Sequence, residues 1–165
     1  MGPSIPGWCW ASAPPRVLPG GTSTLTANLT HNSSGGSGFS VPNGVSVAFA
    51  GGSLGTVNPT NTTLTSGTAS STFTAGSSAG NATPTAIVDN ARVSATIFIL
   101  DTVVVNTSPT GLSFSVDGTN YTTAQTFNWM VGSPHSIATS SPQNVSGDRN
   151  KYSPVGRMPA LSPMQ

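Results

Sequence analysis

Charged residues are scarce in this chain, and glutamate is absent. Lys, Arg and Asp make up 5% of its 165 residues, whereas an average domain has about 25% charged residues. Acid–base and nucleophilic catalysis need carboxylates, histidine, cysteine or lysine held close together. The chain offers only a dispersed set of such side chains: Asp89, Asp101, Asp117, Asp148, His31, His135, Cys9 and Lys151. The composition therefore argues against an enzyme.

Several other signals are also missing. Cys9 is the only cysteine, so an intrachain disulfide is excluded, and no zinc-ligand spacing is present. The longest apolar stretch, 95–105, is interrupted by Asp101 and is too short to span a bilayer. The first residues lack the basic and apolar segments of a signal peptide. The net charge of +1 forms no basic stripe, which disfavours nucleic acid as a partner. We expect no cofactor, no bound metal and no membrane insertion by this chain.

What is present is a period-two alternation of apolar and hydroxyl-bearing residues. Such alternation places one set of side chains on the buried face of a strand and the other set in water. No window has a useful helical period, and Pro and Gly interrupt every candidate. The predicted inward-facing sets are Leu25, Ala27 and Leu29; Val45, Val47 and Phe49; Ala69, Ser71, Phe73 and Ala75; and Val93, Ala95, Ile97 and Ile99. The sequence therefore predicts an all-β fold, with a β-sandwich over residues 17–100.

Turn signals separate these strands. Asp89-Asn90 and Asp117-Gly118 tolerate positive φ and predict tight hairpins. Pro84 lies inside an otherwise good strand pattern and cannot donate a ladder hydrogen bond, so we expect an edge or a bulge there. A second, smaller β unit is expected over 101–150. The proline-rich residues 1–16 are expected to be a disordered leader.

Residues 17–100 resemble the bacterial Ig-like repeats of the intimin/invasin kind. The resemblance rests on PGGTSTLTANLT, VPNGVSVAFAGGSLGTVNP, SGTASSTFTAGSSAGNATPTAIVDN and ARVSATIFI. Pro84 departs from the family pattern, which usually has a β-former there. The resemblance implies an Ig-like sandwich and transfers no catalytic residues.

Residues 102–138 resemble a PEGA-like surface repeat. The pattern is V-x-V-x-T-x-P-x-G-L-x-x-x-V-D-G, then Y, F-x-W and G-x-x-H-x-I. Both families are stalk or spacer modules of large exported proteins. The resemblance implies a non-catalytic structural spacer or adhesin-type module of a cell-surface protein. The implied partners are neighbouring Ig-like repeats or surface glycans.

Two other functions stay open at this stage. One is an accessory carbohydrate-binding module of a secreted protein, with Tyr121 and Trp129 as its candidate ligand-contact residues. An exposed, coplanar pair would favour that function, whereas core packing of the same aromatics is the more ordinary expectation. The other is an Ig-like decoration domain of a phage virion.

The remaining polar candidates have ordinary explanations. His135 has no neighbouring ligand residue in the sequence, so a capping or packing role is expected for it. Asp89, Asp101 and Asp117 could contact Ca²⁺, but that ion prefers six to eight oxygen ligands, and turn formation explains Asp89 and Asp117 better. Residues 151–165 are expected to be a disordered tail or an out-of-frame reading of a normal repeat.

Overall fold

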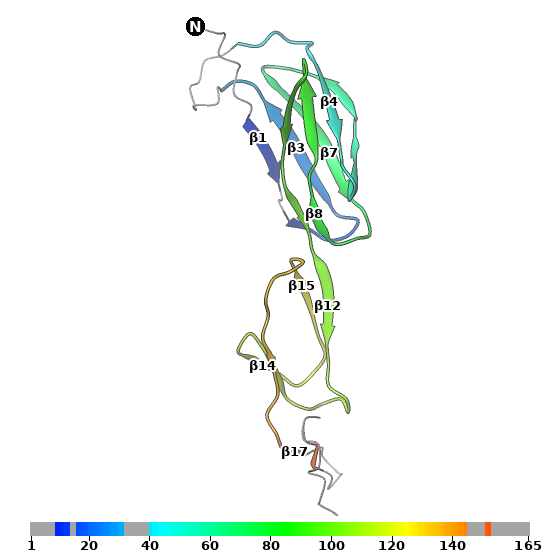
Figure 1. Ribbon diagram of the computed structural model, residues 1–165, viewed down its shortest axis with the longest axis vertical. Coiled ribbons are helices and arrows are strands. Elements are labelled where there is room, and N and C mark those ends of the chain that lie inside the picture. The colour runs from blue at the N-terminus through cyan, green and yellow to red at the C-terminus, as the bar shows by residue number, and fades with distance from the viewer. Residues whose placement is uncertain (1–8, 14–15, 32–39, 145–150, 153–165) are drawn as a thin grey trace, which may run out of the picture. The chain divides into compact units, whose positions relative to one another are not determined.

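A computed structural model describes residues 9–13, 16–31, 40–144 and 151–152 (Figure 1). Within these residues the regular structure is entirely extended, as predicted. No helix in this part of the chain is long and apolar enough to cross a membrane. The strands are β1 (Cys9–Ala13), β2 (Arg16–Val17), β3 (Thr22–Asn28), β4 (Ser46–Ala50), β5 (Gly55–Asn58), β6 (Asn61–Thr63), β7 (Thr68–Ala75), β8 (Gly80–Ala82), β9 (Thr85–Val88), β10 (Ala91–Ser94), β11 (Ile97–Ile99), β12 (Asp101–Val105), β13 (Phe114–Val116), β14 (Thr119–Tyr121), β15 (Gln125–Trp129), β16 (Ile137–Ala138), β17 (Gln143–Asn144) and β18 (Lys151–Tyr152).

The described residues divide into two compact units. The first extends to Thr102 and includes Asn128–Gly132, and the second comprises Val103–Phe127 and the residues from Ser133 onward. The predicted boundary between residues 100 and 101, and the PEGA-like assignment of the second unit, stay predictions.

One sheet of the first unit has the order β1-β3-β7-β5, with antiparallel neighbours. β3 and β7 form its longest ladder, from Thr22 opposite Thr74 to Asn28 opposite Thr68. The inward-facing residues of these two strands are buried, as the alternation predicts: Ser23, Leu25, Ala27, Ala69, Ser71, Phe73 and Ala75. Thr and Val side chains suit such a pleated surface with one wet face.

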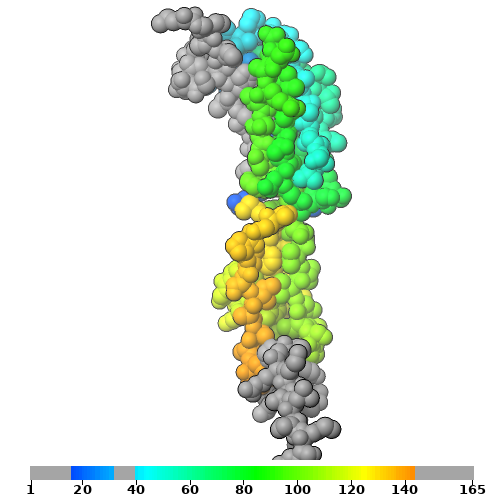
Figure 2. Space-filling view, in the orientation of Figure 1, coloured from blue at the N-terminus to red at the C-terminus, as the bar shows by residue number. Residues whose placement is uncertain are grey.

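The opposite layer contains the orders β10-β9-β4-β6 and β2-β11-β8. The pairs β9–β10 and β8–β11 are successive parts of one long hairpin that is interrupted at Pro84, where the Ala95 N–H donates to the Pro84 carbonyl at 3.1 Å. Pro84 is buried and lies between β8 and β9 rather than within either strand. Because Pro84 lacks an N–H, the ladder is interrupted at this residue. The proline lies outside β9, so β9 can pair on both sides, with β10 and with β4. In Figure 2 the green surface of this hairpin lies beside the cyan surface of β4.

A single hydrophobic core joins the two layers. Phe73 and Leu25 enter it from one sheet, and Val47, Ile97 and Ile99 enter it from the other. All five side chains are fully buried. Two layers with these strand orders, packed face to face over one core, form an Ig-like β-sandwich.

The expectation of a disordered leader over residues 1–16 is wrong for the part that the structure describes. β1 pairs antiparallel with β3, from Cys9 opposite Asn28 to Ala13 opposite Thr24, and β2 pairs parallel with β11. Pairing satisfies N–H and C=O groups along one edge of β3, a requirement that local sequence patterns do not reveal. Residues 1–8 lie outside the described part of the chain.

The second unit contains small sheets. In one of them β13 lies between β14 and β16, and β12 pairs with β15 in a separate two-stranded sheet whose outer residues, 101–102 and 128–129, belong to the first unit. β17 pairs with β18, so Lys151 and Tyr152 depart from the expected disordered tail because their backbone groups pair with Gln143 and Asn144. The rest of the tail, 153–165, lies outside the described residues.

Both predicted hairpin turns are confirmed. Asp89 and Asn90 have φ values of 45° and 65°, and β9 and β10 pair directly across them. Asp117 and Gly118 have φ values of 50° and 80°, and Val116 pairs with Thr119. Asn, Asp and Gly visit this left-handed region at lower cost than other residues.

Candidate functional site

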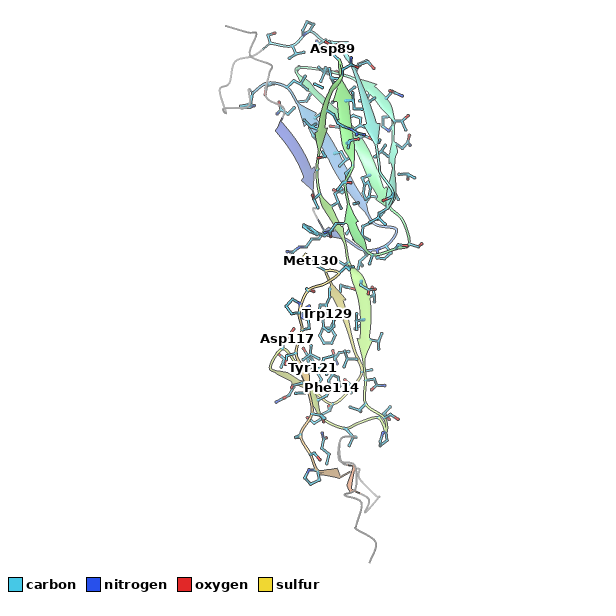
Figure 3. The ribbon with its side chains drawn as sticks, in the orientation of Figure 1. Asp89, Phe114, Asp117, Tyr121, Trp129 and Met130 are labelled. Atoms are coloured by element: carbon cyan, nitrogen blue, oxygen red, sulfur yellow. The ribbon has the colours of Figure 1, made fainter. Side chains whose placement is uncertain are left out.

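The densest group of chemically active side chains in the described structure surrounds Asp117 in the second unit (Figure 3). Asp117 follows β13 in the tight turn to β14, and its side chain reaches the segment that leads into β16. Its Oδ1 accepts the Ser136 N–H at 2.8 Å, and its own N–H donates to the Ser136 carbonyl at 2.8 Å. These two bonds fix the segment before β16 against the turn.

His135 joins Asp117 to a serine. His135 Nδ1 lies 2.7 Å from Asp117 Oδ2, and His135 Nε2 lies 2.8 Å from Ser133 Oγ. The Asp117 side chain is exposed, the His135 imidazole is only 22% exposed, and Ser133 is half-buried. The imidazole therefore connects a carboxylate on one nitrogen to a hydroxyl on the other.

The electrostatics of this group favour the ionised carboxylate. The hydrogen bond from His135 lowers the pKa of Asp117, and the Ser136 N–H lowers it further. An ionised carboxylate only accepts hydrogen bonds, so Nδ1 of the neutral imidazole carries the proton that faces it. Nε2 is then the acceptor, and the Ser133 hydroxyl donates to it.

Sequence reasoning placed Asp117 correctly in a turn and expected a capping or packing role for His135, but it did not connect the two residues. They are 18 positions apart, and Ser133 was not singled out. The sequence did contain a signal for this contact. Asp117 was predicted in a turn after one strand and His135 just before another, and the pairing of these strands, β13 and β16, brings Asp117 and His135 together.

The aromatic candidates lie in different surroundings. Tyr121 is half-buried, with its ring centroid 5.7 Å from that of Phe114 and 5.8 Å from that of Phe127. This is the packing geometry of a small aromatic core, with Phe114 buried beneath (Figure 3). Trp129 is half-buried and belongs to the first unit. Ligand contact by Tyr121 and Trp129 stays a prediction.

The other acidic candidates are isolated in the part of the chain that the structure describes. Asp89 and Asp101 are exposed, and Asp89 forms the β9–β10 turn. Among the described residues, no three His, Cys, Asp or Glu side chains are grouped so that they could hold a metal ion.

An open depression of about 510 Å³ lies at one end of the first unit. Thr30, Val41, Asn43 and Ser66 are among its lining residues. Asn43 Oδ1 already accepts the Ser66 N–H at 2.8 Å, and Thr30 Oγ1 donates to Asn28 Oδ1 at 2.7 Å. These polar atoms are thus used in holding the loops together.

Comparisons with known proteins give one similarity. No family model matches the chain, and neither does any curated protein. Among solved structures, the adhesin InvE of Yersinia pseudotuberculosis matches at 24% sequence identity and a TM-score of 0.40, over 68% of this chain and 34% of that one. The chain thus spans about a third of the length of that adhesin chain.

Proposed function

We propose that the chain is a non-catalytic structural module of an exported cell-surface protein, of the kind that spaces or presents adhesive parts. The observation that carries this proposal is the organisation of the first unit. It is an Ig-like sandwich. Its inward-facing side chains are buried in one core, and its outward-facing residues are mainly Thr, Ser and Asn. Such a surface offers few charged groups to a partner.

The second unit supports the same proposal through its arrangement in the chain. It follows the sandwich closely in the sequence, since β11 ends at Ile99 and the second unit begins at Val103. Consecutive β units in one chain are typical of stalk-like proteins. The resemblance of residues 17–100 to intimin/invasin repeats and of 102–138 to PEGA-like repeats points in the same direction.

The carbohydrate-binding alternative has weaker support. Tyr121 packs between Phe114 and Phe127, which is what an aromatic core requires and is not what a sugar platform requires. The phage-decoration alternative has no specific observation in its favour.

Surface display tests the proposal. The chain is inserted between a membrane anchor and a small binding domain on a bacterial cell, and capture of a bulky ligand is compared with that of a fusion carrying a Gly/Ser linker of the same number of residues. We expect the folded chain to support capture at least as well as the linker, and the purified chain alone to give no sugar-specific retention. Loss of capture relative to the linker would contradict a spacing role, and saturable retention by one glycan would favour the carbohydrate-binding module.

A further inference from the structure

We infer that Ser133 is a covalent acceptor site, whose hydroxyl takes an acyl group from an activated ester with His135 as the base. The inference goes beyond the proposed spacing role, because a spacer needs no reactive hydroxyl. It rests on the unbroken chain of contacts from Asp117 Oδ2 to His135 Nδ1 at 2.7 Å and from His135 Nε2 to Ser133 Oγ at 2.8 Å. Turn formation alone accounts for the Asp117–Ser136 bonds, but it does not require Ser133 to face the imidazole.

The direction of the hydrogen bonds sets the reactivity. Asp117 holds the proton on Nδ1, so the Nε2 lone pair faces the Ser133 hydroxyl. A serine hydroxyl is a weak nucleophile unless an adjacent base takes its proton as it attacks. A carboxylate that fixes the tautomer and orientation of that base completes the arrangement by which such serines are activated. Asp117 is thus a positioning residue, and it is itself anchored by the Ser136 N–H.

The chemical step is a single acyl transfer. Ser133 Oγ attacks the carbonyl carbon of an ester, and the hydroxyl proton passes to His135 Nε2. The tetrahedral intermediate expels the alcohol or phenol, which takes that proton from His135 as it leaves. The products are an O-acylated Ser133 and one molecule of free alcohol, so no oxidant, metal or further reactant is needed. The His135 side chain is 22% exposed and Ser133 is half-buried, so the acyl donor approaches through the part of this group that stays open to solvent.

A labelling experiment on the full chain tests this inference. The probe is p-nitrophenyl acetate, with a fluorophosphonate as a second probe, and adducts are located by intact-mass and peptide mass spectrometry. We expect one principal adduct on Ser133, abolished in Ser133→Ala. His135→Asn should slow labelling by about 100-fold, the size of an ordinary general-base contribution. Ser136→Ala is the matched control, because it keeps the Ser136 backbone bonds to Asp117 and should label at the wild-type rate.

Asp117→Asn separates positioning from folding. An asparagine tolerates the positive φ at this position and can still accept the Ser136 N–H. Its amide N–H would face His135 Nδ1, move the imidazole proton to Nε2 and remove the acceptor for Ser133. We expect labelling to fall by at least about tenfold while the chain stays folded, with its thermal unfolding midpoint at neutral pH lowered only by the loss of the Asp117 carboxylate. Labelling that is absent in the wild type, spread over many serines, or unchanged in His135→Asn would overturn the inference, and none of these outcomes bears on the spacing role.

Discussion

The side-chain amide of Gln143 hydrogen-bonds to both backbone polar groups of Ser113. Its Oε1 accepts the Ser113 N–H at 2.6 Å, and its Nε2 donates to the Ser113 carbonyl at 2.6 Å. The amide thus occupies the place of a neighbouring strand residue just before β13 begins at Phe114. Thr139 also donates to the Ser113 carbonyl, at 3.0 Å, so both residues hold this end of the second unit.

Gln143→Ala should destabilise the second unit by about 1–3 kcal/mol, because it leaves the two backbone groups of half-buried Ser113 without this partner. The measurement is the urea unfolding midpoint followed by near-ultraviolet signals of Tyr121. Gln125→Ala is the matched control, since its amide contacts only the nearby Thr123, at 3.2 Å. It should change stability by less than about 0.5 kcal/mol. Equal effects of the two substitutions would refute the role given to Gln143.

Gly55→Ala should destabilise the sandwich because the added Cβ would overlap the Phe73 ring. Phe73 is fully buried in the core and cannot swing into solvent, so we expect a cost of about 1–3 kcal/mol in the free energy of unfolding. Gly76→Ala is a milder comparison, since its nearest atom outside the neighbouring residues is the Leu54 carbonyl oxygen at 3.1 Å. The double variant Gly55→Ala/Phe73→Leu should recover part of the loss. A double variant that shows purely additive losses would contradict the steric explanation.

Asn90→Ala should destabilise the β9–β10 hairpin by about 1 kcal/mol, because alanine tolerates the left-handed conformation less well than asparagine. Asn90 has a φ of 65° and is exposed, so no packing is lost in the exchange. Asn61→Ala, in the exposed strand β6, removes the same side chain from extended backbone and should change stability by less than about 0.5 kcal/mol. The measurement is the thermal unfolding midpoint of the two variants. A larger loss of stability in Asn61→Ala than in Asn90→Ala would be inconsistent with the turn geometry.

Protonation of Asp117 should weaken the second unit in acid. The pKa of Asp117 is lowered in the folded chain, by the bond from His135 and then by the Ser136 N–H. A carboxyl with a depressed folded-state pKa stabilises the fold above its unfolded pKa, and that contribution is lost as the pH falls through the folded value. The unfolding midpoint of the wild type should therefore decline below about pH 4, relative to Asp117→Asn, which lacks this titration. Parallel pH profiles of the two proteins would contradict the linkage.

The features that could be predicted from sequence are those with a local cause. Alternation assigned Leu25, Phe73 and Ile97 to the core, and turn chemistry identified Asp89-Asn90 and Asp117-Gly118. These predictions succeeded because side-chain period and positive-φ tolerance act over a few residues.

The features that escaped prediction depend on distant pairing. β1 forms because β3 offers it an edge, and the contact of Asp117 with His135 forms because β13 pairs with β16. The Gln143 amide hydrogen-bonds to the backbone of Ser113, 30 residues earlier and just before β13. Composition and periodicity carry no information about such partners, since each depends on the register of strands remote in the chain.

The spacing role requires the first unit to stay folded when the chain is pulled, and single-molecule stretching tests this directly. With handles at the two ends of the chain, the sandwich should resist and then unfold in one cooperative step. That step should release roughly 330 Å for residues 9–102, at about 3.5 Å per residue, less the folded end-to-end distance. Gly55→Ala should lower the force of this step. Smooth extension without a step would contradict the account of the chain as a folded spacer.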